Sequence, residues 1–303
     1  MSGDVRRALA DRGIELKRYR PGNHRAPCPC CAKGKRDDAL AVKIDHEGAC
    51  WHCHRCGEQG GTRNGKSNTM LDSAPPPRPE PERHEALSDW GRTLWENARP
   101  IEPGTIAATY LEGRGCALPP FPDAIHLRWH PALSDLVSGY TGPALVALVT
   151  DAETGAEINL HRTWLRHDGA GKAPIDTPRR LLKGHPARGV IRLWPDAEVT
   201  LGLVLGEGIE SCLAAARAGL VPVWAAISAG NLKAFPVLPG LDGLALLIDH
   251  DKPNPRTGIR AGHDAALAVI EHYAAAGFDP ERDLRIVLPP TEGEDAADLE
   301  VPA

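Results

Sequence analysis

The sequence predicts a multi-domain α/β chain: a small cysteine-rich domain, a mixed α+β region, and a C-terminal domain built on a parallel sheet. Two CxxC pairs lie within the first 60 residues, and the proline-rich run APPPRPEPERH at residues 74–84 separates them from the rest. From residue 201 onward, apolar strand-like runs alternate with helix-like runs, as in buried parallel sheets with crossover helices. A length of 303 residues also exceeds that of a typical single domain.

The composition excludes several classes of protein. Hydrophobic residues make up 42% and charged residues 25% of the chain, as in ordinary globular proteins, and no apolar run approaches the ~20 residues of a membrane span. The first residues carry no apolar stretch of signal-peptide length, so we expect a cytoplasmic protein without a membrane partner. In a reducing compartment, close cysteine pairs bind metal more often than they form disulfides.

The net charge of −5 is unevenly distributed along the chain. Residues 1–70 carry 14 Lys and Arg against 8 Asp and Glu, and residues 158–192 carry 8 against 2, so each zone has a net charge of +6. Residues 193–303 carry 7 against 17, a net charge of −10. Two basic zones and one acidic zone indicate surfaces that handle a polyanion beside a site for a cation.

The cysteine pairs predict a structural zinc site. Cys28 and Cys31 form one CxxC knuckle, and Cys53 and Cys56 form a second about twenty residues later. Each tight turn can present two thiolates to one tetrahedral Zn²⁺, and the intervening residues can supply the strands of a small sheet. The competing interpretation is a set of buried, reduced thiols. Five other residues are close enough in sequence to replace one ligand: His24, Cys30, Cys50, His52 and His54.

The run CPCC followed by WHCHRCGEQGG resembles the N-terminal zinc ribbon of bacterial and phage DNA primases. The family commonly has other residues where this chain has Pro29 and Cys30, so the first knuckle departs from the pattern and the second follows it. The resemblance implies a zinc-ribbon domain over residues 1–70. The prolines that follow remove backbone donors and fix φ, so they predict a semi-rigid linker over residues 71–86.

Residues 87–198 are expected to form a basic α+β subdomain. The run LSDWGRTLWENA is helix-like and leads into a second helical stretch at residues 105–112, and a turn at residues 153–155 separates two β-type runs of a predicted hairpin. The cations that follow suit phosphate groups, because guanidinium groups pair bidentately with phosphate oxygens, although such charges are commonly only solvated. They are Arg162, Arg166, Lys172, Arg179, Arg180 and Lys183.

Three carboxylates follow predicted strands of the C-terminal domain. Glu207 ends the run LGLVLGE, while Asp249 and Asp251 end the run LALLIDHD. Ligands of open α/β sheets bind at the carboxyl ends of the strands, and crowded carboxylates need a cation, for which Mg²⁺ is the usual partner of phosphate substrates. The alternative is that these side chains only cap strands and helices.

This part of the chain resembles the Toprim domain of primases, topoisomerases and certain nucleases in three motifs. They are Glu207 with Gly208, then Asp249-His250-Asp251, and then a glycine before an alanine-rich helix. The resemblance implies a Rossmann-like parallel sheet over residues 199–303, with catalytic Mg²⁺ or Mn²⁺ bound by the glutamate and both aspartates. The glutamate would also act as acid or base, while His250 is expected to turn into the sheet. Ser228 and Gly230 resemble the family's small-residue turn. Asp295 and Asp298 resemble a later acidic motif, or are solvated tail charge.

From residue 87 to the aspartates, the chain resembles the Toprim primases of phages, plasmids and integrated elements. This resemblance implies synthesis of short RNA primers from nucleoside triphosphates on a single-stranded DNA template. The chain has no Walker-type motif, so a replicative helicase would be a separate partner. Two alternatives stay open: a Toprim nuclease or phosphoesterase, and a non-catalytic DNA-binding accessory. Three tryptophans could stack on bases, but core packing is the preferred interpretation for each: Trp51, Trp164 and Trp194.

Overall fold

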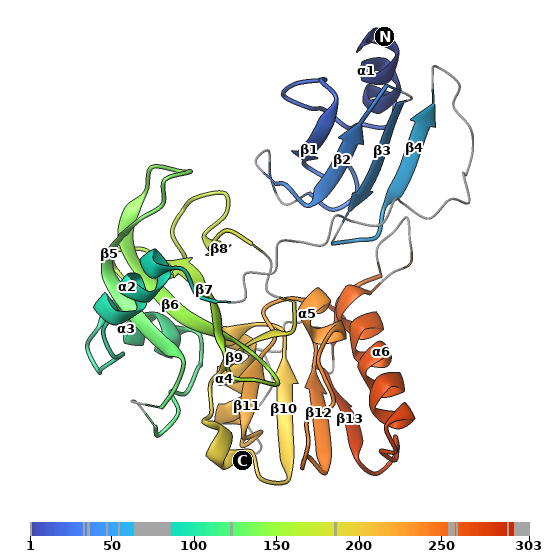
Figure 1. Ribbon diagram of the computed structural model, residues 1–303. Helices are drawn as coiled ribbons and strands as arrows, with labels where there is room; N and C mark the ends of the chain where they lie inside the picture. The colour runs from blue at the N-terminus through green and yellow to red at the C-terminus, as the bar shows by residue number, and fades with distance from the viewer. Residues whose placement is uncertain are drawn as a thin grey trace. The chain divides into compact units, whose positions relative to one another are not determined.

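The computed structural model describes residues 2–32, 34, 37–46, 48–53, 55–63, 86–121, 124–184, 187–253, 258, 260–289 and 291–293. The chain divides into two compact units, residues 1–80 with 253–261, and residues 81–252 with 262–303 (Figure 1). Residues 71–85 of the predicted linker lie outside the described residues, as do His54, Asp295 and Asp298.

The first unit is a helix packed on a four-stranded antiparallel sheet. Helix α1 (Ser2–Ala10) precedes strands in the order β1-β2-β3-β4: β1 (Gly22–Ala26), β2 (Leu40–Ile44), β3 (Gly48–Cys53) and β4 (Gln59–Arg63). Alternate residues of β2 are buried, so one face of the sheet forms the core with Leu9 and Ile14. Gly60 is required for this packing, because a Cβ there would lie 2.5 Å from the ring of Trp51.

The second unit is built on one nine-stranded sheet, in the order β13-β12-β10-β11-β9-β6-β7-β8, with β5 paired to β6. Its C-terminal part holds the parallel strands β10 (Gly202–Gly206), β11 (Val223–Ala225), β12 (Gly243–Leu247) and β13 (Leu284–Val287). Its helices are α4 (Ile209–Arg217), α5 (Ala229–Lys233) and α6 (Ala261–Ala275).

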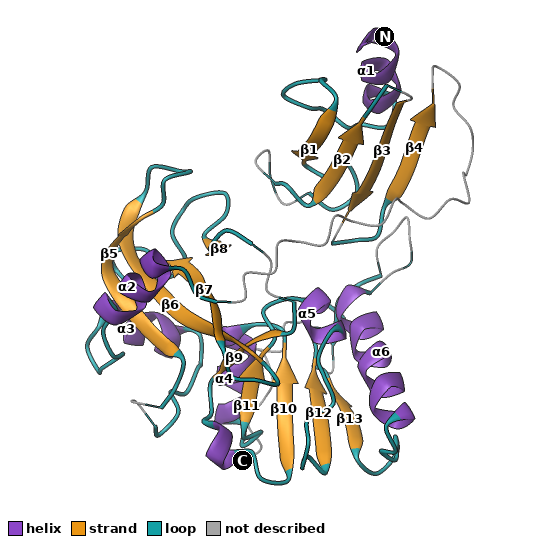
Figure 2. Cartoon of the chain, viewed as in Figure 1, coloured by secondary structure: helices purple, strands orange, loops and turns teal. Residues whose placement is uncertain are grey.

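The parallel strands are apolar on both faces because helices cover both faces (Figure 2). Leu203 and Leu205 of β10 belong to the core that α6 covers, whereas Val204 between them belongs to the core under α4. The α/β class predicted from the alternating runs is therefore confirmed.

The other half of the sheet is antiparallel and consists of β5 (Leu127–Ser134), β6 (Thr141–Asp151), β7 (Glu157–Trp164), β8 (Arg179–Leu181) and β9 (Gly189–Arg192). Strands β6 and β7 form the predicted hairpin, whose turn is fixed by the carboxylate of Asp151 accepting from the backbone N–H groups of Glu153 and Thr154. Helices α2 (Asp89–Asn97) and α3 (Ile106–Gly113) belong to this part, and a short 3₁₀ helix, η1 (Asp196–Glu198), precedes β10.

Strand β9 joins the two halves. It pairs antiparallel with β11 on one side and with β6 on the other, so the basic region and the C-terminal region share one continuous sheet. Asn231 of α5 reinforces the joint, since its buried side-chain amide donates to the carbonyl of Gly189 at 3.1 Å. In the part of the chain that the structure describes, no helix has both the length and the apolarity that crossing a membrane demands.

Candidate functional site

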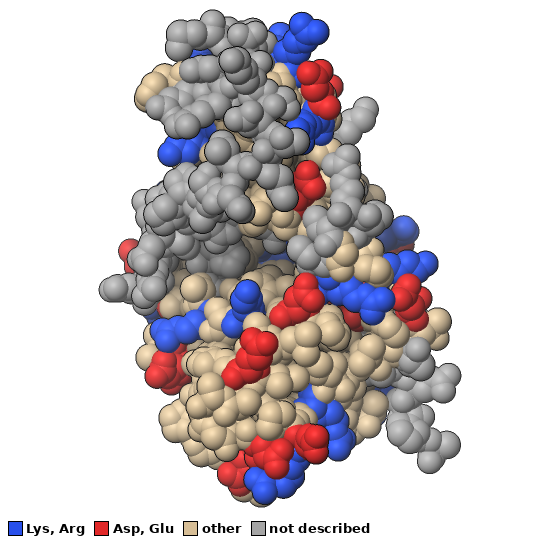
Figure 3. Space-filling view, turned by 90° about the vertical axis from the view of Figure 1, so that its right-hand side faces the viewer, with Lys and Arg blue, Asp and Glu red and all other residues tan. Residues whose placement is uncertain are grey.

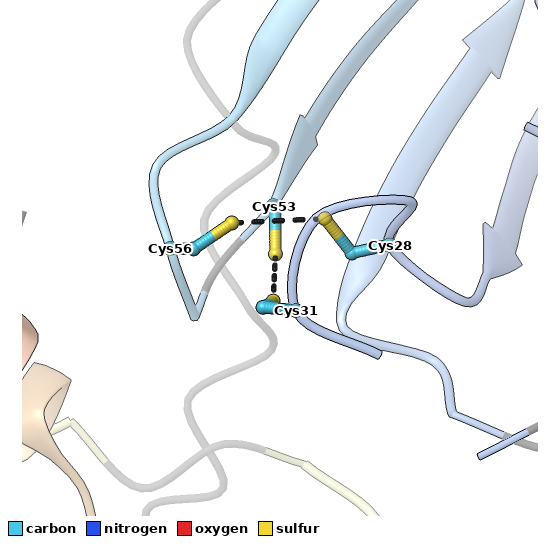
Figure 4. Close-up of side chains that lie close together, drawn as sticks. All are labelled: Cys28, Cys31, Cys53 and Cys56. Atoms are coloured by element: carbon cyan, nitrogen blue, oxygen red, sulfur yellow. Dashed lines mark hydrogen bonds between the residues drawn. The ribbon is translucent and has the colours of Figure 1, made fainter. Parts of the chain in front are cut away.

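The two cysteine knuckles meet in the first unit (Figure 4). Cys28 and Cys31 follow β1, Cys53 ends β3, and Cys56 lies in the turn before β4. The Sγ atoms of Cys28 and Cys56 lie 3.6 Å apart, those of Cys31 and Cys53 lie 3.5 Å apart, and all four lie within 4.8 Å of one another. A tetrahedral ion with Zn–S bonds of ~2.3 Å separates its thiolates by about 3.8 Å, so this set fits Zn²⁺.

Backbone geometry holds the knuckles in this form. The N–H of Cys30 points at the sulfur of Cys28, and the N–H of Arg55 points at the sulfur of Cys53, each at 3.4 Å. Arg55 also donates to the carbonyl of Cys31 at 2.9 Å and pairs with Asp37 at 2.5 Å. One side chain thus ties the second knuckle to the first.

Burial and neighbouring groups shift the pKa values of the clustered thiols. Burial raises the pKa of Cys56 to about 12 and raises the pKa of Cys31 further, whereas backbone N–H donors outweigh burial at Cys28 and lower its pKa. Four thiolates this close together, three of them buried, therefore require a bound cation. Of the other proposed ligands that the structure describes, none belongs to this cluster: His24, Cys30, Cys50 and His52.

In the second unit, Glu207 and Asp249 lie at the same edge of the sheet. Strands β10 and β12 are neighbours and parallel, with Gly206 opposite Leu247, so the residues after both strands leave the sheet side by side. Glu207 and Asp249 are partly buried, whereas Asp251 is exposed. Gly206 allows α4 to approach this edge, because a Cβ there would lie 2.6 Å from the Sγ of Cys212.

These carboxylates form a looser arrangement than the cysteines. Among the described residues, the cysteine cluster is the only group of three or more metal-ligating side chains whose ligand atoms all lie within 4.8 Å. Mg²⁺ usually takes one or two carboxylates and keeps several waters, so oxygen donors at adjacent strand ends suit it without closer contact. The Nδ1 of His250 lies 2.9 Å from the carbonyl oxygen of Pro289, an acceptor, so the backbone after β13 engages this nitrogen.

A further carboxylate, that of Glu210, is buried in the first turn of α4, three residues after Glu207. Its Oε1 accepts from the hydroxyl of Tyr110 at 2.7 Å and pairs with Lys172 Nζ at 2.8 Å. Burial raises the pKa of Glu210, but Lys172, Tyr110 and Arg179 outweigh it and lower the pKa to about 2. The negative charge of Glu210 therefore attracts Lys172 and Arg179 toward the edge of the sheet where Glu207 follows β10.

The predicted phosphate-binding cations divide between the two faces of β7 and β8. Directly paired residues share a face, and successive residues alternate, so Arg162 and Arg180 lie on one face and Arg179 lies with His161 on the other. Arg179 and Lys172 are on the side of Glu210, since both shift its pKa.

The remaining two cations, Arg166 and Lys183, are exposed. Lys183 follows β8, and Arg166 pairs with Asp168 at 2.6 Å in an exposed ion pair. On the face that Figure 3 presents, basic and acidic side chains are interspersed.

Comparisons with known proteins assign part of this architecture. Residues 202–301 match the family model of the Toprim domain. Residues 202–301 form a Toprim domain. Glu207, Asp249 and Asp251 all lie inside it. Residues 85–193 match a domain of unknown function, DUF7146, and the search of curated proteins found no match.

Several solved structures resemble the chain weakly. The zinc-binding and RNA polymerase domains of the Aquifex aeolicus primase share 16% identity, with 98% of this chain and 80% of that chain covered and a TM-score of 0.43. The primase fragment of the bacteriophage T7 primase-helicase protein shares 14%, with 91% and 92% covered and a TM-score of 0.38. The E. coli primase catalytic core shares 18%, with 70% and 73% covered and a TM-score of 0.42.

Several residues of interest escape sequence reasoning. Glu210 reads as an ordinary acidic residue in the first turn of a helix. Tyr110 and His161 carry no motif, and Trp90 is not distinguishable from the buried tryptophans. Trp51, Trp164 and Trp194 are all buried, which confirms core packing as the preferred interpretation for them, whereas Trp90 of α2 is 56% exposed.

Proposed function

We propose that the chain is a DNA primase, which synthesises short RNA primers on single-stranded DNA by metal-dependent nucleotidyl transfer. The observation that carries the proposal is the pair of adjacent parallel strands in the Toprim domain, with Glu207 and Asp249 at their carboxyl ends. The four-cysteine cluster in the same chain supports it, because it supplies a second module suited to holding the template. We propose four segments in the chain: a zinc ribbon (residues 1–70), a linker (71–86), a basic α+β subdomain (87–198) and the Toprim domain (199–303).

In this proposal Glu207, Asp249 and Asp251 hold Mg²⁺ or Mn²⁺. When bound, the metal favours ionisation of the primer's 3′-hydroxyl and stabilises the charge on departing pyrophosphate. Glu207 is partly buried beside the first turn of α4, where a carboxylate can accept and return a proton. Cys28, Cys31, Cys53 and Cys56 hold structural Zn²⁺.

The cations on the Glu210 side would receive the incoming nucleoside triphosphate. Lys172 is 29% exposed while bonded to Glu210, so its position is fixed and part of its surface remains open. Arg179 is exposed next to it on the same side. Arg162, Arg180 and Lys183 would contact the single-stranded template. A replicative helicase on a separate chain is the expected protein partner.

The test is nucleotide incorporation by the purified full chain. Single-stranded circular DNA, labelled ribonucleotides and Mg²⁺ should yield short RNA with the wild type and none with Glu207→Gln or Asp249→Asn. Asp242→Asn is the matched control, because Asp242 is exposed at the opposite end of the strand that leads to Asp249. RNA products that persist in both site variants would refute the assignment of the site.

The same preparation separates the alternative functions. Metal-dependent nicking of DNA without added nucleotides, lost in Glu207→Gln, would identify a Toprim nuclease instead. DNA binding without any metal-dependent turnover would identify a non-catalytic accessory.

A further inference from the structure

The exposed tryptophan of the second unit lies beside two cross-strand arginines. Trp90 is in the first turn of α2, and its side chain is on the surface although the helix packs against β7. Gly91 makes this approach possible, because a Cβ at that position would lie 2.7 Å from Leu87 and 2.8 Å from Leu182. The neighbouring residue is therefore packed tightly while the indole of Trp90 is left to solvent.

Arg162 lies near two indole rings. The guanidinium carbon of Arg162 lies 5.9 Å from the ring centroid of Trp90 and 5.1 Å from that of the buried Trp164. Arg162 donates to the carbonyl of Leu181 at 2.7 Å. Among the described residues, none accepts a hydrogen bond from its buried Nε. A cation within about 6 Å of an indole ring is attracted to its face, so Arg162 favours the observed position of Trp90.

The positive charges of Arg162 and Arg180 are only partly balanced by a nearby carboxylate. Arg162 and Arg180 are directly opposite each other on β7 and β8, a like-charge pairing that is unfavourable in a sheet. The carboxylate of Asp135 lies 3.4 Å from Arg180 Nε, and it already accepts from the backbone N–H groups of Val137 and Ser138. Two guanidinium groups facing one carboxylate leave a net positive charge.

We propose that Trp90 is a base-stacking residue of a single-stranded nucleic-acid site on this face, with Arg162 and Arg180 contacting the backbone phosphates. An exposed ring with an excess of cations beside it is the combination that binds single strands without reading sequence. This face carries Arg162 and Arg180, whereas Lys172 and Arg179 lie on the Glu210 side, so strand and nucleotide would approach opposite faces of β7 and β8. This inference rests on the proposed function in one respect: the single strand that binds here would be the template of the primase.

The experiment measures binding alone, without metal or nucleotides, so its outcome is independent of primer synthesis. The full chain is titrated into a fluorescently labelled oligothymidine of about 20 nucleotides and followed by anisotropy. Trp90→Ala should raise Kd about 5- to 100-fold, as expected for the loss of one stacked base. Trp90→Phe retains a ring and should recover most of the affinity. Leu201→Ala, which also truncates an exposed apolar side chain, should leave Kd unchanged.

Two further readouts separate stacking from charge. On an abasic strand of the same length, Trp90→Ala should bind as the wild type does, since no base remains to stack. Arg180→Gln should reduce the slope of log Kd against log salt by about 0.7, the value for one phosphate contact on a single strand, whereas Trp90→Ala should not change the slope.

Three results would overturn the proposal: wild-type affinity in Trp90→Ala, equal losses in Trp90→Ala and Trp90→Phe, or the same loss on the abasic strand. Wild-type affinity in Trp90→Ala would point instead to a protein partner for this surface.

Discussion

Replacing Glu210 by Gln tests whether its buried charge holds the basic region to the Toprim domain. Glu210 is only 8% exposed and bonds both Lys172 and Tyr110. Its pKa of about 2, against an ordinary value of 4.5, corresponds to about 3 kcal/mol at neutral pH. We therefore expect Glu210→Gln to lower the free energy of unfolding by about 3 kcal/mol at pH 7, since Lys172 then loses its countercharge.

The pH dependence of that difference follows from the direction of the shift. A carboxyl whose pKa is lower in the folded state stabilises the fold above its unfolded pKa, and this stabilisation is lost as the pH falls toward the folded pKa. With values of 4.5 and about 2, about 1 kcal/mol of the difference should be lost by pH 4 and about 2 kcal/mol by pH 3.

The assay is urea unfolding of the wild type and the variant, followed by circular dichroism at pH 7, 4 and 3. Acid effects on other groups cancel because both proteins carry them. Glu153→Gln is the control: Glu153 is 52% exposed in its pair with Arg188, and such surface pairs contribute ~1 kcal/mol or less. A difference that stays constant from pH 7 to pH 3, or a Glu210→Gln variant as stable as the wild type at pH 7, would refute the reasoning.

Two further predictions concern the metal site and the packing of the Toprim edge. Cys53→Ser should remove the bound zinc found by metal analysis and make the first unit sensitive to protease, whereas Cys50→Ser, outside the cluster, should leave both unchanged. Gly206→Ala should lower the free energy of unfolding by about 1–3 kcal/mol, because its Cβ would lie 2.6 Å from the Sγ of Cys212. In Gly202→Ala the nearest atom is 3.7 Å away, so thermal denaturation should show little change.

The parts of the site that the sequence predicts are those fixed by local pattern. Two CxxC knuckles about twenty residues apart on a small sheet can scarcely avoid meeting, and Cys28, Cys31, Cys53 and Cys56 do meet. Likewise, two apolar runs that form neighbouring parallel strands must place the residues that follow them at one edge. The periodicity of the chain thus places Glu207 and Asp249 at strand ends, and the order of the strands in the sheet makes those two ends neighbours.

The parts that the sequence does not predict depend on register and on distant partners. Whether Arg179 or Arg180 faces Glu210 depends on how a three-residue strand, β8, pairs with β7, and a shift of one residue would exchange them. Glu210 and Lys172 are 38 positions apart, and only the fold of the loop before β8 brings them together. Short strands such as β9, which joins the two halves of the sheet, leave too few residues for a pattern.

The charges around the Toprim edge predict that metal must bind before or together with the nucleotide. Burial raises the pKa of Cys212, and the charges of Asp249 and Glu210 raise it further, so both carboxylates lie near this thiol. Glu207, Glu210, Asp249 and Asp251 bring carboxylates to this part of the domain, while Lys172 and Arg179 bring cations from the basic region. Burial and Arg179 lower the pKa of His161 to about 4, so this ring is neutral at pH 7 and adds nothing.

Carboxylates at this edge repel a nucleoside triphosphate, and a bound divalent cation offsets that repulsion. Calorimetric titration of the full chain with a ribonucleoside triphosphate should therefore show binding in Mg²⁺ and at least tenfold weaker binding in a metal chelator added after zinc loading. In Asp249→Asn the edge loses one negative charge, so the metal-free affinity should rise while the effect of Mg²⁺ shrinks. Equal affinity with and without Mg²⁺ in the wild type would show that the cations of the basic region bind the triphosphate alone, and that the carboxylates do not govern its entry.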